Sequence, residues 1–400
     1  MNVIPKPLVP VVYTFLAHYR TGVFRELMHS DEYDIMFVGS VKDPGAHGIK
    51  CWEVPAGTTF LATTHCFLFG RWILQSRTIA LALRSGIGSI IFLGEVYNIS
   101  TWIAAGFARL TGKRVYFWSH GWTEPDRGIK RYIRVAFYRL AHGMLLYGHH
   151  AKQIGIQFGF KKERMHVIYN SLDYTAQIAA RESVKEEELL GIRETLFPAQ
   201  HTRPMLICTG RLIPMRRLEI LFEALDLLQN EGFSVNLLLV GDGPHRTALE
   251  SYAQRRNLSV HFYGACYNEA LLARFFMASD LLVMPGSIGL SAIHSLAYGT
   301  PVIVHDDPND QGPEWESIIP GFNGAHFAHG DSKDLARCIR GWIRTVRDRQ
   351  VIRANCHEVV DRFYNPTSQA ALIRRALDGK LADDSLWEEF LRDRTSGFCP

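Results

Sequence analysis

Patterned cysteines are what this sequence most clearly lacks. Its seven cysteines are scattered over 400 residues, odd in number, and no two stand in Cys-x2-Cys spacing. Such a set argues against a structural zinc site and fits reduced thiols in a cytoplasm. No pair of histidines has convincing metal-ligand spacing either. We therefore expect no bound metal and no other cofactor.

Long apolar runs are absent too. No window reaches 18 uncharged apolar residues, so we expect no membrane-spanning helix. Pro5 and Pro7 stand near the start and no long apolar run follows them, which argues against a signal peptide. The sequence therefore predicts a cytoplasmic protein.

A strong charge excess is also missing. The formal net charge of +4 is too weak to indicate a nucleic-acid partner, but it is compatible with an anionic membrane face or a polyanionic substrate. What the chain does have is apolar content, because 47% hydrophobic and 12% aromatic residues can build sizeable cores. At roughly 150 residues per domain, the length predicts two or three domains.

Strand-like and helix-like segments alternate along the first 170 residues. This alternation is typical of a parallel sheet with helices on both faces. We interpret the stretch from Gly57 to Leu83, rich in Phe, Trp and Leu, as helices with a basic edge. The expected strands include 8–15, 33–38, 89–93 and 114–118.

The character of the chain changes after about Tyr174, where a Glu-rich helix precedes Phe197-Pro198, and the alternation restarts at Met205. Each later strand leads into a glycine-bearing loop, as in a second doubly wound α/β domain. We predict an N-terminal domain over 1–180, a linker over 181–203, a C-terminal domain over 204–364, and helices over 365–400 that pack back on the N-terminal domain.

The stretch from Val283 to Ile303 reads as a strand, a turn at Pro285-Gly286, and a helix that follows Gly289. Backbone N–H groups at a helix N-terminus suit an anion, above all a phosphate. An ordinary strand-to-helix turn would show the same pattern, so this stretch alone leaves both readings open.

A second loop of the same kind runs from Gly210 to Arg217 directly after a buried strand. Guanidinium groups match phosphate oxygens and stay charged, so its three arginines form a candidate anion clamp. Plain surface charge is the alternative. With the Gly286 stretch in the same sheet, the loop predicts a diphosphate site.

Five motifs in order give the chain a family resemblance. "VIYNSLD", "TGRLIPMRR", "LLLVGDGPHRTALE", "HFYGA" and "ASDLLVMPGSIGLSAIHSLAYGTPVI" resemble family 4 of the retaining, nucleotide-sugar-dependent glycosyltransferases. They cover about Val167 to Gly324, and "HYRTGVF" and "WSHGW" match more loosely. The resemblance implies a GT-B fold, with two Rossmann-like domains facing across a cleft, the donor on the C-terminal domain and the acceptor on the N-terminal one.

The resemblance also implies roles for single residues. Arg211 and Arg216, the latter in place of the usual lysine, would neutralise the leaving diphosphate without a metal. His120 would lie near the transferred sugar, although it could also simply pack the cleft. The other implied donor contacts are the distal-phosphate residues Gly289 and Leu290, the base-pocket residues Tyr263, Gly264 and Ala265, and Gly22 from the other domain.

One departure from the family pattern matters. The Glu-x7-Glu pair falls at Gly286 and His294, and neither is a carboxylate, although His294 can still donate or accept a hydrogen bond. The chain is then either a subgroup that grips its donor differently or a non-catalytic member. Carboxylates that could substitute follow the next strand, at Asp306, Asp307, Glu314 and Glu316, unless they form only a solvated loop. Glu95 is an acceptor-side candidate.

Residues 127–142 form an expected basic amphipathic helix, either a solvated face or a dock for anionic lipid. We predict a retaining, metal-independent glycosyltransferase that moves a sugar from a nucleotide-diphosphate donor to a lipid-linked or polysaccharide acceptor, cytoplasmic or peripheral at the inner membrane face. A front-face departure of the phosphate is expected, because Gly286 offers no nucleophile. The alternatives are a non-catalytic carbohydrate- or nucleotide-binding member of an assembly complex and a nucleotide-sugar epimerase.

Overall fold

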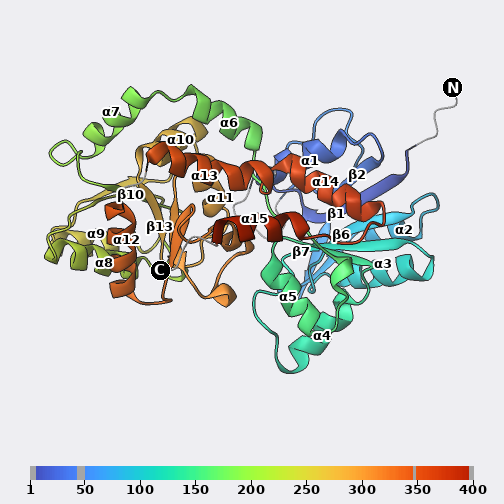
Figure 1. Ribbon diagram of the computed structural model, residues 1–400. Helices are drawn as coiled ribbons and strands as arrows, with labels where there is room; N and C mark the ends of the chain where they lie inside the picture. Colours follow the sequence, from blue (N-terminus) through green and yellow to red (C-terminus); the bar gives the residue numbers. More distant parts are fainter. Residues whose placement is uncertain (1–5, 43–49, 346–347, 396–400) are drawn as a thin grey trace. The chain divides into compact units, whose positions relative to one another are not determined.

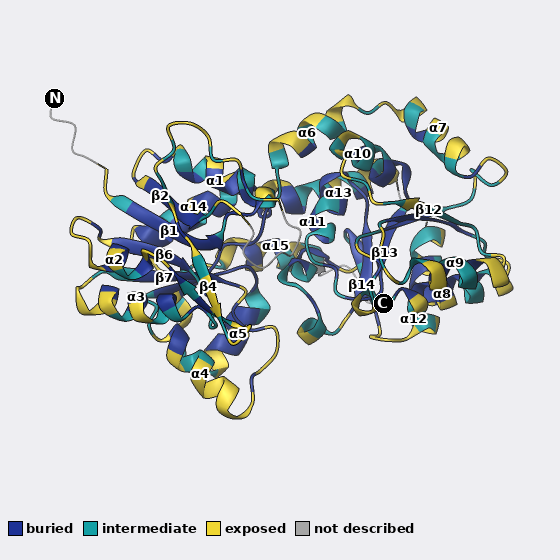
Figure 2. Ribbon diagram, turned by 180° about the vertical axis from the view of Figure 1, so that it is seen from behind, coloured by how far each residue is buried: buried dark blue, intermediate teal, exposed yellow. Residues whose placement is uncertain are grey.

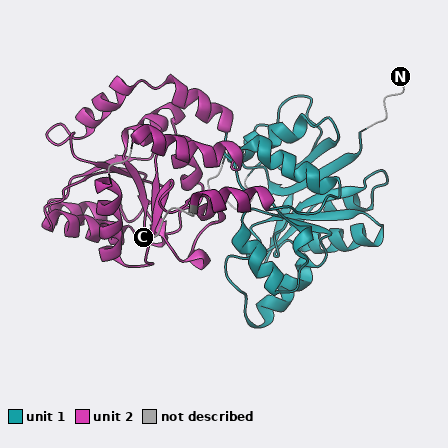
Figure 3. Ribbon diagram, viewed as in Figure 1, with its two compact units in different colours: residues 1–173, 365–384 teal, residues 174–364, 385–400 magenta. Residues whose placement is uncertain are grey.

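The computed structural model describes residues 6–42, 50–345 and 348–395, and the chain divides into two compact units (Figure 3). The N-terminal unit comprises residues 1–173 and 365–384, and the C-terminal unit comprises 174–364 and 385–400. Pro5, and residues 396–400 of the expected C-terminal helices, lie outside the described residues. No helix in the described ranges is both long and apolar enough to cross a bilayer.

The N-terminal unit is built on a seven-stranded parallel sheet in the order β3-β2-β1-β6-β7-β8-β9 (Figure 1). Its strands are β1 Leu8–Phe15, β2 Asp34–Ser40, β3 Phe60–Ala62, β6 Ser89–Leu93, β7 Arg114–Ser119, β8 Gly143–Leu146 and β9 Met165–Val167. Its helices are α1 Thr21–Met28, α2 Thr78–Leu83, α3 Ile99–Leu110, α4 Gly128–Tyr138, α5 His149–Gln157 and α14 Pro366–Leu377. Short 3-10 turns lie at His18–Arg20 and Lys162–Arg164.

Successive side chains of β1 pack into hydrophobic cores on opposite faces of the sheet, because side chains alternate along a strand. Val11 belongs to the cluster that packs with α1 and α14, whereas Val12 belongs to the cluster that packs with α2 and α3. The sheet is therefore covered on both faces, and its central strands β1, β6, β7 and β8 are almost entirely buried (Figure 2). This is the doubly wound arrangement that the alternation of strands and helices predicts.

The prediction of helices throughout Gly57–Leu83 is wrong for most of the stretch. Besides β3 and α2 it holds an antiparallel hairpin, β4 His65–Leu68 and β5 Trp72–Gln75. Phe69 and Gly70 turn the hairpin with φ of 51° and 67°, as in a two-residue turn with positive φ at both central positions. The aromatic and β-branched residues that flank this turn favour strands over helices.

The C-terminal unit has a six-stranded parallel sheet in the order β12-β11-β10-β13-β14-β15. Numbered within the unit, this is the order 3-2-1-4-5-6 of a Rossmann sheet, whose direction of winding reverses between β10 and β13. The strands are β10 Met205–Thr209, β11 Asn236–Val240, β12 Val260–Gly264, β13 Leu281–Met284, β14 Val302–His305 and β15 Gly324–Phe327. The helices of this sheet are α8 Leu218–Asn230, α9 Arg246–Arg255, α10 Glu269–Ala278, α11 Ser291–Ala297, α12 Ser332–Arg344 and α13 Arg349–Arg362. Further 3-10 turns are η3 Pro214–Arg216, η4 Pro308–Asp310 and η5 Pro313–Ser317.

Residues 181–203 are not a linker, which corrects the expected boundary. The helices α6 Tyr174–Ser183 and α7 Glu186–Leu196 belong to the C-terminal unit. Leu189 of α7 and the following Phe197 are buried against Met205 of β10 and Ala278 of α10. The three glutamates in the first turn of α7, Glu186 to Glu188, are exposed or half-buried, so composition alone suggested a solvated connection.

The expected tail over 365–400 is divided between the units. Residues 365–384, which include α14, belong to the N-terminal unit, whereas α15 Ser385–Thr395 belongs to the C-terminal one. Trp387 and Phe390 of α15 are buried and stack edge-on against Phe363. This aromatic contact explains why α15 stays with the C-terminal unit.

Candidate functional site

The loop after β10 carries the three arginines of the expected clamp. Arg211 is exposed, and among the described residues its guanidinium has no hydrogen bond or ion pair. Arg216, at the end of η3, is half-buried and lies over Gly210, within 3.8 Å of where a Cβ would stand on that glycine. Arg217 begins α8 in a left-handed conformation, with φ of 48°.

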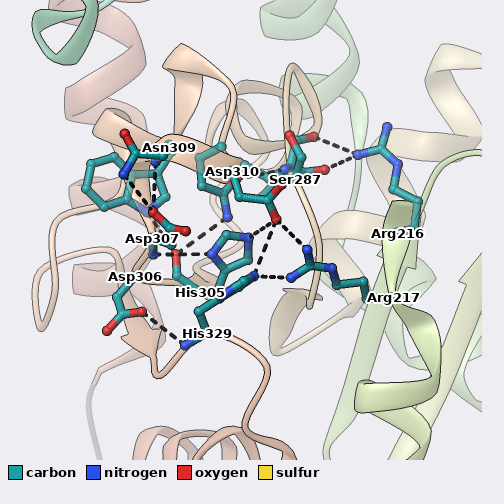
Figure 4. Close-up of polar contacts among 12 residues, drawn as sticks. Arg216, Arg217, Ser287, His305, Asp306, Asp307, Asn309, Asp310 and His329 are labelled. Atoms are coloured by element: carbon teal, nitrogen blue, oxygen red, sulfur yellow. Dashed lines mark hydrogen bonds and ion pairs between the residues drawn. The ribbon is translucent and has the colours of Figure 1, made fainter. Parts of the chain in front are cut away.

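The loop after β13 meets the arginine loop. Arg216 donates from Nη1 to the carbonyl oxygen of Ser287 and lies 3.5 Å from that of Ile288 (Figure 4). The two loops follow β10 and β13, the neighbouring strands between which the winding of the sheet reverses. Ligands of such sheets bind beyond the strand ends at this place.

Gly286 is pressed against the arginine loop. A Cβ on Gly286 would lie 2.5 Å from the carbonyl oxygen of Met215 and 2.9 Å from the Arg216 backbone. No side chain fits there without a shift of backbone, so a carboxylate at this position is incompatible with the observed loop. The close approach explains why the family's first acidic position is a glycine in this chain.

Gly289 and Leu290 come next, before α11 begins at Ser291. Gly289 has φ of 58°, a conformation that glycine adopts without strain. The preceding N–H, that of Ile288, already donates to Gln311 Oε1 at 3.0 Å. The expected role of the Gly289 and Leu290 backbone in holding a distal phosphate stays a prediction.

His294, at the family's second acidic position, has a carboxylate partner from another helix. Its Nε2 lies 2.8 Å from Glu269 Oε1 at the start of α10, and Tyr298 donates to the same oxygen. Burial alone raises the pKa of Glu269, but the hydrogen bonds from His294 and Tyr298 outweigh it and lower that pKa. Glu269 is therefore ionised at neutral pH and restores a negative charge beside position 294. Sequence reasoning missed it, because it stands 25 residues from its partner.

The four substitute carboxylates lie in different settings. Asp306 accepts a hydrogen bond from the His329 backbone N–H, and Asp307 caps η4 by accepting from the Asn309 N–H. Glu316 lies on η5 and is half-buried. Glu314, only 3% exposed, is directed toward the Gly289 stretch: a Cβ on Gly312 would lie 2.9 Å from its Oε2 and 3.3 Å from the Gly289 Cα. Of the four, Glu314 is the carboxylate at the expected phosphate loop.

A histidine and aspartate cluster lies beside the arginine loop (Figure 4). Each of His305, Asp310 and His329 offers one ligand atom, and these atoms lie within 4.8 Å of one another, a spacing that a metal ion could bridge. However, Arg217 already binds Asp310 at 3.1 Å and contacts His329. The Asp307 N–H also donates to His305 Nδ1 at 3.3 Å, which places the proton of a neutral ring on Nε2 and leaves no lone pair for a metal there. The cluster therefore acts as a polar support for Arg217.

Tyr263 and Gly264 are the last residues of β12, an edge strand of the sheet, and Ala265 follows them. Backbone hydrogen bonds connect Gly264, through the end of β11, to the arginine loop. The Gly241 N–H donates to the Gly264 carbonyl at 2.8 Å, and the Gly210 N–H donates to Val240 at 2.9 Å. A Cβ on Gly241 would lie 1.9 Å from the Gly210 carbonyl oxygen. Gly241 thus permits a close approach of the two loops that a side chain would prevent.

In the N-terminal unit, His120 lines a pocket of about 480 Å³ at the ends of β1, β6 and β7. Its ring packs on Tyr147 at 4.7 Å. His120 is itself exposed to solvent, but desolvation by the surrounding pocket wall, and next the positive charge of Arg20, lower its pKa and favour the neutral imidazole. Glu95 lines the same pocket and accepts a hydrogen bond from Thr14 at 3.1 Å.

Gly22 is buried in the first turn of α1. A Cβ there would lie 2.7 Å from Pro366 Cγ and 2.9 Å from the Leu172 carbonyl oxygen. Packing within the N-terminal unit thus suffices to explain this glycine, and its expected approach to a donor stays a prediction.

The C-terminal site lies inside a region with known relatives. Residues 195–359 match the model of the family described as glycosyl transferases group 1. This region is a group 1 glycosyltransferase domain. The glycogen synthase of Halorhodospira halophila is 30% identical over 151 residues, which are 36% of this chain and 31% of that protein. The GDP-mannose-dependent alpha-(1-6)-phosphatidylinositol dimannoside mannosyltransferase of Mycobacterium tuberculosis is 32% identical over 109 residues, 26% of this chain and 28% of that protein.

These matches are partial, because the aligned residues span only 31% and 28% of the length of these two relatives. A solved structure extends the likeness in fold to both units. The Anabaena protein HepE in complex with UDP has a TM-score of 0.67 at 16% identity, over 94% of this chain and 100% of that one. The GT-B fold class is thereby confirmed, and the expected family is confirmed for residues 195–359. The cleft expected between the domains stays a prediction.

Proposed function

We propose that the protein is a retaining, metal-independent glycosyltransferase that moves a sugar from a nucleotide-diphosphate donor to a lipid-linked or polysaccharide acceptor in cell-surface glycan synthesis. The observation that carries the proposal is the Arg216 bridge between the two loops at the reversal point of the sheet, with Arg211 beside it. HepE, a protein of the same fold, binds UDP in its solved structure. We extend that donor class to this chain.

In this proposal the two arginines stabilise the charge that develops on the leaving diphosphate. Arg216 uses Nη1 to hold the Ser287 loop, and its remaining N–H groups are free to face a phosphate. Arg211 offers its whole guanidinium. The acceptor hydroxyl enters on the face from which the diphosphate leaves, because no carboxylate fits at Gly286 to serve as a nucleophile.

A donor panel tests the proposal. The purified protein is offered UDP-, GDP- and ADP-sugars with acceptor glycans and glycolipids, and products are identified by mass spectrometry and their anomeric configuration by NMR. Arg211→Ala should lower kcat by roughly 10²- to 10³-fold, as for loss of one group that stabilises transition-state charge. Arg255→Ala removes an exposed arginine of the same unit and should leave the rate unchanged. Chelation with EDTA should have no effect.

A non-catalytic binding role is the second candidate, and the missing carboxylates favour it. It predicts nucleotide binding without turnover for every donor and acceptor offered. No transfer in the panel, together with nucleotide binding that Arg211→Ala leaves unchanged, would sink the enzyme proposal. An epimerase would instead turn over its donor with no acceptor present.

We also propose that α4 brings the protein to the inner membrane face, where a lipid-linked acceptor would lie. Ile129 and Tyr132 on this helix are 77% and 73% exposed, next to the exposed Arg127 and Arg131 (Figure 2). Apolar and basic side chains on one exposed helix suit the boundary between headgroups and acyl chains. The mycobacterial relative is named for a phosphatidylinositol mannoside, which is a lipid substrate.

A further inference from the structure

The pocket of the N-terminal unit contains a buried arginine that the sequence did not single out. Arg20 ends the 3-10 turn after β1, is only 7% exposed, and lines the pocket together with His120 and Glu95. Four aromatic rings surround it, with centroids 5.0–5.7 Å from its guanidinium carbon: Tyr13, Tyr19, Trp118 and Tyr147.

This arginine forms no ion pair with any residue that the structure describes. Among the described residues, no carboxylate lies within ion-pair distance of Arg20, and its Nη1 is buried without a hydrogen-bond partner. Burial raises the pKa of the Tyr13 hydroxyl well above its usual value, so Tyr13 supplies no negative charge either. Arg134, the other arginine of the pocket, differs because it is paired with Asp126 at 2.7 Å.

An unpaired buried charge is costly to keep. Removal of an ion from water is strongly unfavourable, and attraction to the surrounding aromatic rings offsets only part of that cost. A buried, unpaired guanidinium is favourable where a bound anion neutralises its charge. Its two parallel N–H groups match the two oxygens of a carboxylate or phosphate. A neutral His120 carries no positive charge that would attract the anion away from Arg20. The aromatic rings that line the pocket offer flat surfaces to the apolar faces of a ligand.

We propose that this pocket binds the acceptor through an anionic group, a carboxylate or a phosphate, that pairs with Arg20. The inference rests on the proposed transferase function, in which the N-terminal unit holds the acceptor. It narrows the acceptor class from any glycan or glycolipid to one with a negative charge close to the accepting sugar. A uronic acid residue and a phosphate-linked sugar are the two sources of such a charge.

Matched probes test the proposal by isothermal titration calorimetry on the full chain without donor. We expect p-nitrophenyl β-D-glucuronide to bind about tenfold or more tightly than p-nitrophenyl β-D-glucoside, which differs in the carboxylate. p-Nitrophenyl phosphate forms the phosphate arm, and the stronger of the two anionic probes identifies the source. Equal affinity of the glucoside and both anionic probes overturns the proposal, and this comparison requires no variant.

Variants locate the anion. Arg20→Gln should abolish the anionic preference, whereas Arg84→Gln, an exposed arginine of the same unit, and Arg211→Ala, in the other unit, should retain it. A preference that survives Arg20→Gln, or disappears in Arg211→Ala, places the anion elsewhere and overturns the proposal. If Arg20→Gln does not fold, Arg20→Lys keeps the charge but not the fork and should weaken glucuronide binding while sparing the glucoside.

The two proposals fail separately, because these titrations need no turnover. Absence of transfer from every donor, with the anionic preference intact, removes the transferase function and leaves the anion site. Transfer to neutral acceptors by a protein without any anionic preference leaves the function and removes the site.

Discussion

At the scale of single residues, Gly286 lies where two backbone segments approach each other closely. The carbonyl oxygen of Met215 occupies the space where its side chain would begin. The loss of the family's first carboxylate is thus coupled to the way η3 and the Arg216 guanidinium reach the second loop. A glutamate substituted for Gly286 would therefore not restore the family's carboxylate site, because the observed loop leaves no space for a side chain there.

We expect Gly286→Ala to lower the free energy of unfolding by about 1–3 kcal/mol through overpacking, and Gly286→Glu to abolish nucleotide binding without a gain in transfer. Urea unfolding and calorimetry with UDP measure both effects. Gly341→Ala is the matched control, because nothing lies within 4 Å of a Cβ at this position in α12. A stable, more active Gly286→Glu would contradict this account of the loop.

The pair His294 and Glu269 makes a second residue-level prediction. His294→Glu would set two carboxylates side by side where the nitrogen and oxygen are now 2.8 Å apart. We expect it to destabilise the protein by about 1–3 kcal/mol at pH 7, and the double variant with Glu269→Gln to recover most of that loss. Additive effects in this double-mutant cycle, measured by urea unfolding, would argue against a direct coupling.

At the scale of elements, α4 yields a prediction about membranes. The double reversal Arg127→Glu/Arg131→Glu should reduce flotation with anionic liposomes at least about fivefold, since each basic side chain near the surface contributes about 1 kcal/mol. Arg134 must stay, because it pairs with the buried Asp126.

The control for α4 is Arg84→Glu/Arg109→Glu, which changes the charge of the same unit by the same amount at exposed positions outside that helix. Equal flotation of both double variants would refute docking through α4. Flotation independent of anionic lipid would leave no role for its basic side chains.

Elements with a clear pattern of apolar residues were predictable from sequence, and elements without one were not. The strands at Leu8, Ser89 and Met205 are uniformly apolar, as both-sided burial requires, so both sheets were foreseen. The β4–β5 hairpin was not predicted, because its turn has Phe69 at a position where asparagine or glycine is usual. α7 was mistaken for a linker because its buried face is narrow.

The candidate site shows the same division. Loop residues marked by glycine and arginine could be identified from local sequence, as with Gly210 and Arg216. Glu269 and Arg20 could not be identified, because their partners are distant along the chain. Glu269 lies 25 positions from His294, and Arg20 contacts aromatic rings of β1, of β7 and at the end of β8.

At the scale of the whole molecule, five histidines that are buried or half-buried make the protein sensitive to acid. Burial, the largest cause in each case, lowers their pKa to about 4; they are His149, His166, His305, His326 and His357. Unfolded histidine titrates near 6.5, so between pH 6.5 and 4 the unfolded state binds more protons than the folded state. Stability is therefore complete above pH 6.5 and falls as the pH drops.

We expect each of these histidines to lower the free energy of unfolding by up to about 1.4 kcal/mol per pH unit within that window. Urea unfolding at pH 7.5, 6 and 5 measures the effect. Both units should respond, because two of the five histidines lie in the N-terminal unit and three in the C-terminal one. Unfolding midpoints that are equal at the three pH values would contradict the assignment.

The chain passes between the units at residues 173–174, 364–365 and 384–385, with a consequence for the order in which the protein is made. Ala370 and Ile373 of α14 complete the core that Phe24 and Val11 begin, about 350 residues earlier on the ribosome. The N-terminal unit therefore cannot close its core during its own synthesis. Domains usually fold in the order of translation. Here the first unit must wait for almost the entire second one, and until then the apolar surface that α14 covers beside α1 is exposed to chaperones.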